Sequence, residues 1–186
     1  RIRIMKMNQI LLDMLQTDSV SGCEAEFAQL IEKAAQPYCE KAETDSMGNL
    51  FIYKKGKDNT KKVMVMTEMD EKGFIVTFID DKGFARVSNL GAADLSEASG
   101  QVHFGSVPGL ILADKDKKED LKITDMFIDI GAASKKEAEE LLQIGDTGCM
   151  TVSQTVMGSK VAGKALSSKA ACFAALSAIK ELKAPQ

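Results

Sequence analysis

The sequence contains a single histidine, His103, and this scarcity limits the metal chemistry that one chain can support. Zinc and cobalt centres that activate water usually take two or more imidazole ligands, supplemented by carboxylates. A histidine-rich metal centre is therefore excluded within one chain. The four cysteines lack CxxC spacing, so neither a zinc knuckle nor a disulfide framework is indicated.

Long apolar runs and strong charge are also missing. No run approaches the roughly 20 apolar residues that cross a bilayer, and the N-terminal residues lack the apolar core and cleavage site of a signal peptide. The net charge of -3 gives no electrostatic footprint for nucleic acid or anionic lipid. These absences predict a cytoplasmic globular protein whose partners are small molecules or other proteins.

The N-terminal part combines two amphipathic helices with short strands. Apolar residues recur at three- and four-residue spacing from Lys6 to Gln16, which predicts a helix. A second helix is predicted to begin at a capping box, Ser21 with Glu24, and to end at Pro37. Three strands are then predicted from the β-prone runs at 41–45, 50–53 and 62–66.

From Phe74 to Met157 the sequence changes to short β-prone runs separated by glycines and charged turns. This spacing predicts a small β-barrel or sandwich rather than a continued α/β sheet. One helix interrupts the strands. It is predicted to begin at a capping box of Ser134 and Glu137 and to turn Leu141 and Leu142 inward.

The last segment returns to a pattern of short strand followed by helix. Its alanine-rich helix is predicted to be capped by Ser167 or Ser168. We therefore predict an α/β fold in which a discontinuous domain is interrupted by a second one. The predicted bounds are 1–71 and 160–186 for the α/β domain and 72–159 for the β-rich insert.

Three carboxylates, Glu68, Asp70 and Glu71, follow the apolar run KVMVM. Oxygen ligands of this kind could hold a hard cation such as magnesium or calcium. Strand alternation would place Glu68 and Asp70 on one face and Glu71 on the other, so at most two would converge without a bend. The residues alone leave both a metal site and a solvated turn open, and they favour the turn.

The run GSKVAGKA, from Gly158 to Ala165, nearly matches a phosphate-binding P-loop. Ala165 stands where the P-loop hydroxyl would bind magnesium, and the predicted helix cap falls two or three residues later. A glycine-rich linker is therefore the preferred interpretation. His103 lies in the strand run QVHFG without a Ser, Cys or carboxylate signature, and we expect it to be structural rather than catalytic.

Six segments in a consistent order carry a resemblance to a known family: SVSGCEAEF, TDSMGNLFIYKKGK, MDEKGFIVTFIDDKGF, SGQVHFGS, MFIDIGAASKKEAEELLQIGD and VAGKALSSKAAC. The chain resembles the front half of the glutamyl, or tetrahedral, aminopeptidases of clan MH, which are dinuclear-metal enzymes often labelled cellulase or endoglucanase. The resemblance implies a zinc-peptidase α/β domain interrupted by a PDZ-like β-barrel insert that mediates dimerisation. It also implies two divalent cations, zinc or cobalt, in active members.

The chain departs from that family at the positions of the metal site. TEMDEKG places Glu68 where the family has a ligating histidine, and Asp70 matches the aspartate that orients this histidine. KALSSK places Ser167 or Ser168 at the metal-bridging aspartate, and a hydroxyl cannot bridge two cations as a carboxylate does. The family's paired glutamates and its final histidine would lie beyond Gln186.

These departures predict a degenerate, truncated member of the family, without peptidase activity and with an oligomerising or binding role. The expected partner is a second copy of the chain, bound through the β-rich insert, and a full-length paralogue is a further candidate. No resident cofactor is expected. The alternative is a metal-dependent aminopeptidase that removes N-terminal residues from peptides, with a weakened metal site rebuilt from Glu68, Asp70 and residues of a second chain.

Overall fold

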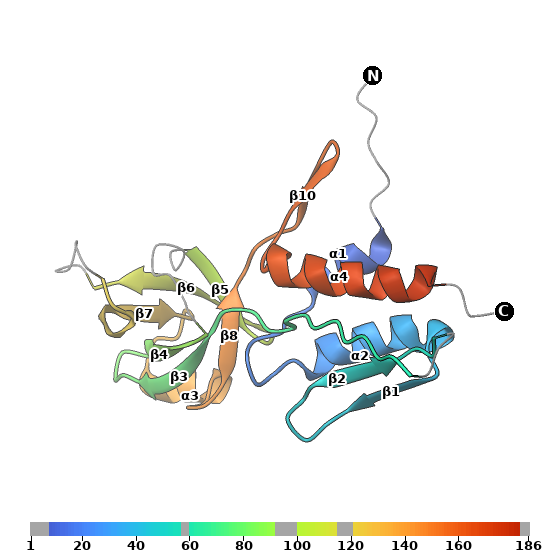
Figure 1. Cartoon of the computed structure of the whole chain (residues 1–186). Coiled ribbons are helices and arrows are strands. Elements are labelled where there is room, and N and C mark those ends of the chain that lie inside the picture. Colours follow the sequence, from blue (N-terminus) through green and yellow to red (C-terminus); the bar gives the residue numbers. More distant parts are fainter. Residues whose placement is uncertain (1–7, 57–59, 92–99, 115–120, 183–186) are drawn as a thin grey trace. The chain divides into compact units, whose positions relative to one another are not determined.

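The computed structural model describes residues 8–56, 60–91, 100–114 and 121–182 (Figure 1). Its contacts divide the chain into two compact units. The first unit joins residues 1–70 to residues 153–186, and the second unit is the intervening segment 71–152. No helix among the described residues is both long enough and apolar enough to span a bilayer.

Three helices supply the core of the first unit. They are α1 (Gln9–Gln16), α2 (Ala25–Ala35) and α4 (Leu166–Glu181). Their facing stripes bury one apolar cluster, which consists of Met14, Phe27, Ile31, Ala35, Cys172 and Leu176. The 3-10 turn η1 (Gln36–Tyr38) follows α2 and contains Pro37, so the predicted end of that helix is confirmed.

The first turn of α2 differs from the prediction. The N-cap of α2 is Glu24, which makes no side-chain cap hydrogen bond. The hydroxyl of Ser21 does not cap the helix and instead donates to Asp70 Oδ2 at 2.6 Å. The predicted capping box is therefore wrong, because a tertiary contact takes the serine. α1, by contrast, has an ordinary cap in which Asn8 Oδ1 accepts from the amide of Ile10 at 3.1 Å.

Two separate hairpins complete the first unit. β1 (Lys41–Thr44) pairs antiparallel with β2 (Leu50–Tyr53), and β9 (Thr155–Met157) pairs antiparallel with β10 (Lys160–Ala162). The second hairpin turns at Gly158, whose φ of 63° favours glycine. The run that resembles a P-loop is therefore a hairpin turn and its second strand, rather than a phosphate loop or a linker.

Residues 62–66 do not form the predicted strand. They pair with no strand among the residues that the structure describes, and Figure 1 draws this stretch as an unpaired green coil beside α4. All four residues from Val63 to Met66 are highly exposed. The prediction fails because β-propensity produces a strand only where neighbouring strands and a buried face support it.

The second unit is a closed barrel, which confirms the β-barrel expected from the short runs. Its strands follow the order β3-β4-β7-β6-β5-β8, and every neighbouring pair is antiparallel. A 3-10 turn, η3 (Ile123–Asp125), precedes β7. The strands are β3 (Gly73–Ile79), β4 (Ala85–Leu90), β5 (Gly100–Phe104), β6 (Val107–Ala113), β7 (Met126–Asp129) and β8 (Thr147–Met150).

Alternate side chains of these strands fill the barrel with one apolar core that includes Val76, Ile111 and Ile128. The helix α3 (Lys135–Leu141) packs against it and is capped as predicted, since Ser134 Oγ accepts from Glu137 N at 3.3 Å. Leu142 is buried, but Leu141 is 49% exposed, so the prediction that both leucines face inward is wrong for Leu141.

Strands β5 and β8 approach one another closely at Gly148. A Cβ atom at this position would lie 2.5 Å from the carbonyl oxygen of His103 and 2.6 Å from the ring of Phe104. Real Cβ atoms do not tolerate such distances, so this part of the barrel requires glycine for space rather than for backbone freedom.

Two neighbouring residues of β6 test the core of the barrel. Ile111 is 1% exposed and Leu112 is 42% exposed. We expect Ile111→Ala to lower the free energy of unfolding by about 2–5 kcal/mol, because it removes buried methyl groups and leaves a cavity. Leu112→Ala is the matched control and should cost under about 1 kcal/mol. Urea denaturation followed by circular dichroism measures both, and equal losses would contradict this core.

Candidate functional site

The residues that the sequence singles out lie on two elements of the first unit. Glu68 and Asp70 belong to the extended segment that ends this part of the chain, and both are exposed. Ser167 and Ser168 lie in the first turn of α4, where Ser167 is exposed and Ser168 is partly buried. Glu71 is 5% exposed and belongs to the second unit, so the three carboxylates do not form one solvated turn.

Asp70 and Ser168 come together, but not as ligands around a common point. The Asp70 carboxylate accepts the hydrogen bond from Ser21, and its backbone carbonyl lies 3.4 Å from Ser168 Oγ. The same Ser168 hydroxyl is closer to the carbonyl of Ala165, at 3.1 Å. A hydroxyl has one proton, so Ser168 is a donor shared between two carbonyls.

Cys172 holds the preceding residues of the segment in the same manner, one helical turn beyond Ser168. Its thiol lies 3.1 Å from the carbonyl oxygen of Glu68 and 3.3 Å from Thr67 Oγ1. Burial raises the pKa of the Cys172 thiol above its usual value, and the hydrogen bond with Thr67 and the charge of Lys169 oppose that shift. At neutral pH the thiol therefore keeps its proton, which it donates to the carbonyl of Glu68.

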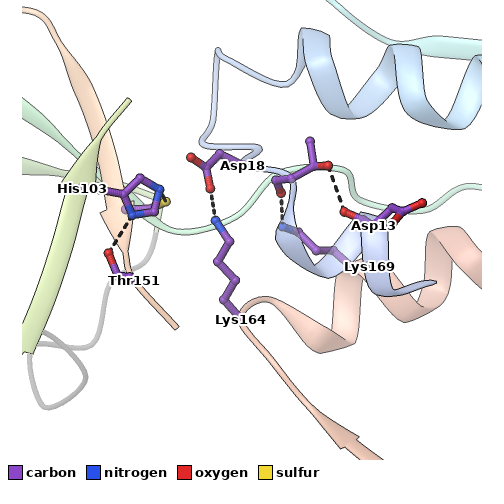
Figure 2. Close-up of polar contacts among 8 residues, drawn as sticks. Asp13, Asp18, His103, Thr151, Lys164 and Lys169 are labelled. Carbon is purple, nitrogen blue, oxygen red and sulfur yellow. Dashed lines mark hydrogen bonds and ion pairs between the residues drawn. The ribbon is translucent and has the colours of Figure 1, made fainter. Parts of the chain in front are cut away.

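Two lysines fix the start of α4 against the end of α1, as Figure 2 shows. Lys164 forms a salt bridge with Asp18, and Lys169 Nζ donates to the carbonyl oxygen of Thr17 at 2.6 Å. The Lys169 side chain is fully buried, and its ammonium lies 5.4 Å from the centre of the Phe27 ring. These contacts determine where Ser168 lies.

The residue before α4 has an unusual backbone. Ala165 is the N-cap and has φ 47° and ψ 34°, the left-handed conformation that non-glycine residues rarely adopt. Its carbonyl accepts hydrogen bonds from the Lys169 amide and from Ser168 Oγ. The helix therefore begins without a capping side chain, and the prediction that Ser167 or Ser168 is the N-cap is wrong.

His103 lies in the second unit, on β5. Its Nδ1 is 2.7 Å from Thr151 Oγ1, and its Nε2 is 3.6 Å from Cys149 Sγ (Figure 2). Both contacts are within hydrogen-bonding distance, the second at a length usual for sulfur, and together they hold the ring in place. This arrangement is compatible with the structural role expected from the sequence, which stays a prediction.

The residues at the candidate site do not fit a dinuclear metal centre. Such a centre needs several ligands around each ion, commonly with a carboxylate between the two ions. Within the described part of the first unit, no three His, Cys, Asp or Glu side chains bring ligand atoms within 4.8 Å of one another. Glu68 and Asp70 offer two carboxylates, one of them bonded to Ser21, and Ser168 offers only a donor hydroxyl.

A family model of M42 glutamyl aminopeptidase matches residues 48–186, which is most of the chain. The chain belongs to the M42 glutamyl aminopeptidase family. The resemblance predicted from the six sequence segments is thereby confirmed. A relative from Acetivibrio thermocellus, provisionally named an aminopeptidase, is 40% identical over 169 residues, which cover 88% of this chain and 50% of the relative.

Solved structures of proteins described as an endoglucanase and as a peptidase have the same fold. A Thermotoga maritima protein described as an endoglucanase superposes with a TM-score of 0.85 at 26% identity, over 94% of this chain and 55% of that one. The TET1 peptidase of Pyrococcus horikoshii, described as assembling into a tetrahedron or a large octahedral shell, gives 0.79 at 26% identity over 94% and 56%. The α/β architecture with its barrel is thus that of M42 aminopeptidases.

The chain spans about half the length of curated relatives that it matches, with 50% of each of two of them covered. Its membership of the M42 family is a statement about ancestry and fold. The activity, substrates and partners of a whole M42 protein are matters for a proposal.

Sequence reasoning missed Lys164 and Lys169, the two residues that place the start of α4. Both are ordinary lysines in a run of small residues, and only their tertiary partners distinguish them. The spacing of Ser168 and Cys172 was a usable signal, because residues four apart share one face of a helix. That face carries the two donors to the 67–70 segment.

Because the pKa of Cys172 is raised in the folded state, the free energy of unfolding depends on pH. The folded state keeps its thiol proton at pH values where the unfolded chain has lost it. The stabilisation is therefore complete below about pH 8, under the ordinary thiol pKa, and decreases as the pH rises through the folded pKa. We expect the unfolding free energy, measured in urea from pH 7 to 10, to fall more steeply for the wild type than for Cys172→Ala.

Cys23 supplies the control because it is exposed. Cys23→Ala should leave the alkaline slope unchanged, and iodoacetamide at pH 8 should modify Cys23 at least about tenfold faster than Cys172. Equal rates of alkylation would contradict a buried neutral thiol at Cys172.

Proposed function

We propose that this chain is a non-catalytic member of the M42 family with an oligomerising or binding role. The supporting observation is that three side chains at or next to the predicted site make hydrogen bonds within the first unit. Asp70 accepts from Ser21, and Ser168 and Cys172 donate to backbone carbonyls. Ser168 and Cys172 thereby join α4 to the segment that contains Glu68 and Asp70, and the bond from Ser21 joins that segment to the residues before α2.

Peptide hydrolysis by an M42-type mechanism requires a metal that lowers the pKa of a bound water and a base that accepts its proton. By the resemblance, Glu68 stands at a histidine ligand, and Ser167 or Ser168 stands at the bridging aspartate. A neutral hydroxyl does not supply the charge that holds two cations together. We therefore assign the positions 68, 70, 167 and 168 to a degenerate metal site without a resident cofactor.

Homo-oligomerisation is the second part of the proposal. P. horikoshii TET1 peptidase is described as assembling into large shells, and the barrel unit is the candidate for a PDZ-like dimerisation insert here. The proposal places this assembly in the cytoplasm, where the four cysteines stay reduced; none of them forms a disulfide.

The opposing function is a metal-dependent aminopeptidase with a rebuilt site. One observation favours it: the carboxylate of Glu68 is exposed and bonds to no described residue, so it is available to a ligand from a second chain. A hard cation would accept such an oxygen ligand.

Metal content and hydrolysis separate the two functions. We expect protein purified without chelators, and then supplied with zinc or cobalt, to hold no stoichiometric metal and to leave aminoacyl-anilides intact. Elemental analysis and absorbance assays measure these outcomes. Glu68→Ala should change neither, and Glu26→Ala, on the exposed face of α2, is the matched control. Stoichiometric metal with turnover that Glu68→Ala abolishes and Glu26→Ala retains would overturn the non-catalytic assignment.

The oligomeric role is tested by light scattering after size exclusion, and by co-purification with a full-length M42 relative from the same cells. We expect the purified chain to form a homo-oligomer by itself. A monomer that is recovered only in complex with the full-length relative would replace self-assembly with a regulatory subunit as the role of this chain.

A further inference from the structure

The side chains of His103, Cys149 and Thr151 form a cluster that the proposed function does not use. His103 and Cys149 lie directly opposite each other on the antiparallel strands β5 and β8, and Thr151 follows β8. Directly opposed residues on one face of a sheet are close enough for their side chains to interact. The strand pairing therefore places a thiol beside an imidazole, and all three residues belong to the second unit.

The contacts within this cluster are those of a thiol and a proton acceptor. Cys149 Sγ lies 3.6 Å from His103 Nε2, and Thr151 Oγ1 lies 2.7 Å from His103 Nδ1 (Figure 2). The neutral ring is assigned the tautomer in which Nδ1–H donates to the threonine hydroxyl, because Nε2 then directs its lone pair at the thiol. Thr151 thereby orients the ring, and Nε2 can take the thiol proton.

Cys172 has the same burial as Cys149 but different neighbours. Each of these two cysteines is 2% exposed. The thiol of Cys172 meets the carbonyl oxygen of Glu68 and the hydroxyl of Thr67, and neither group takes up a proton at neutral pH. The thiolate, not the thiol, is the nucleophile toward oxidants. Of these two equally buried cysteines, Cys149 is therefore the one with a base beside it.

We propose that Cys149 is a site of reversible oxidation by hydrogen peroxide, with His103 as the proton acceptor and Thr151 as the residue that orients it. The thiol proton passes to His103 Nε2, and the thiolate sulfur attacks one oxygen of the peroxide. An S–O bond forms as the O–O bond breaks, and the leaving hydroxide takes the proton back from the imidazolium as water. Sulfur loses two electrons to become a sulfenic acid, the peroxide gains them, and thiol reductants reverse the oxidation.

Oxidation of Cys149 adds an atom where the barrel has little room. β5 and β8 share two paired positions, one of which joins His103 to Cys149. At the neighbouring Gly148, a Cβ atom would lie 2.5 Å from the carbonyl oxygen of His103, so the two strands are already in close contact. An oxygen on the sulfur of Cys149 therefore displaces the His103 ring or separates the strands, and the oxidised barrel is less stable.

Peroxide kinetics on the wild-type chain test the proposal without any substitution. After catalase removes the peroxide, the chain is unfolded in urea with dimedone, which labels each sulfenic acid for mass spectrometry. We expect Cys149 to be oxidised at least about tenfold faster than Cys172 at neutral pH, because the two thiols are equally buried and differ in the base beside them. Equal rates, or a faster reaction of Cys172, would overturn the proposal.

Substitutions separate the proton acceptor from the residue that orients it. His103→Gln keeps a polar side chain without the base and should bring the oxidation rate of Cys149 down to that of Cys172. Thr151→Val removes the hydroxyl and should slow Cys149 several-fold, whereas Thr151→Ser keeps the hydroxyl and should retain the wild-type rate. A purely structural role predicts the opposite sign, since a loosened barrel exposes Cys149 and speeds its reaction. Unchanged or faster oxidation of Cys149 in His103→Gln would contradict the assigned base.

Urea denaturation before and after peroxide treatment measures the effect on the barrel. Oxidised wild type should unfold at a lower urea concentration, dithiothreitol should restore the midpoint, and Cys149→Ala should show no shift. An unchanged midpoint after oxidation of Cys149, or an equal shift in Cys149→Ala, would overturn the effect on the barrel. None of these measurements depends on oligomeric state, so this inference and the proposed function can fail separately.

Discussion

The first unit depends on the contacts of one buried side chain, the ammonium group of Lys169. It donates to the carbonyl of Thr17, the C-cap of α1, and lies over the ring of Phe27 on α2. A cation at the C-terminal end of a helix meets the negative end of the helix dipole, and an unsatisfied buried charge would be costly. One side chain of α4 thereby connects all three helices of the core.

The position of α4 determines which of its side chains contact the other residues of the candidate site. With Lys169 directed toward α1 and α2, Ser168 and Cys172 face the segment that contains Glu68 and Asp70. The side chains of Ser168 and Cys172 thus serve hydrogen bonding between the helix and this segment. The donors of α4 satisfy the carbonyls of Asp70 and Glu68 that approach the helix.

Local sequence patterns predicted most elements, and the failures share one cause. The barrel strands and the strands at 50–53 and 160–162 follow from alternation and turn residues. Ser21 looked like a helix cap and the run 62–66 looked like a strand, but a tertiary partner takes the serine and no neighbouring strand supports the run. Glu68 and Asp70 were candidates from the residues alone, as carboxylates after an apolar run, but Ser167 and Ser168 came from the resemblance, since no local pattern relates residues 68 and 168. Lys169 was missed because burial of a lysine is decided by its partners.

The fold tolerates substitution very differently at Gly148 and at the exposed residues of the candidate site. A side chain at position 148 would collide with the backbone and ring of β5, so almost any substitution there damages the barrel. Glu68 and Ser167 are exposed, and their side chains bond to no described residue. Selection for folding alone would therefore keep Gly148 and leave positions 68 and 167 open to drift. Substitutions at these two positions can therefore accumulate one at a time without an unstable intermediate.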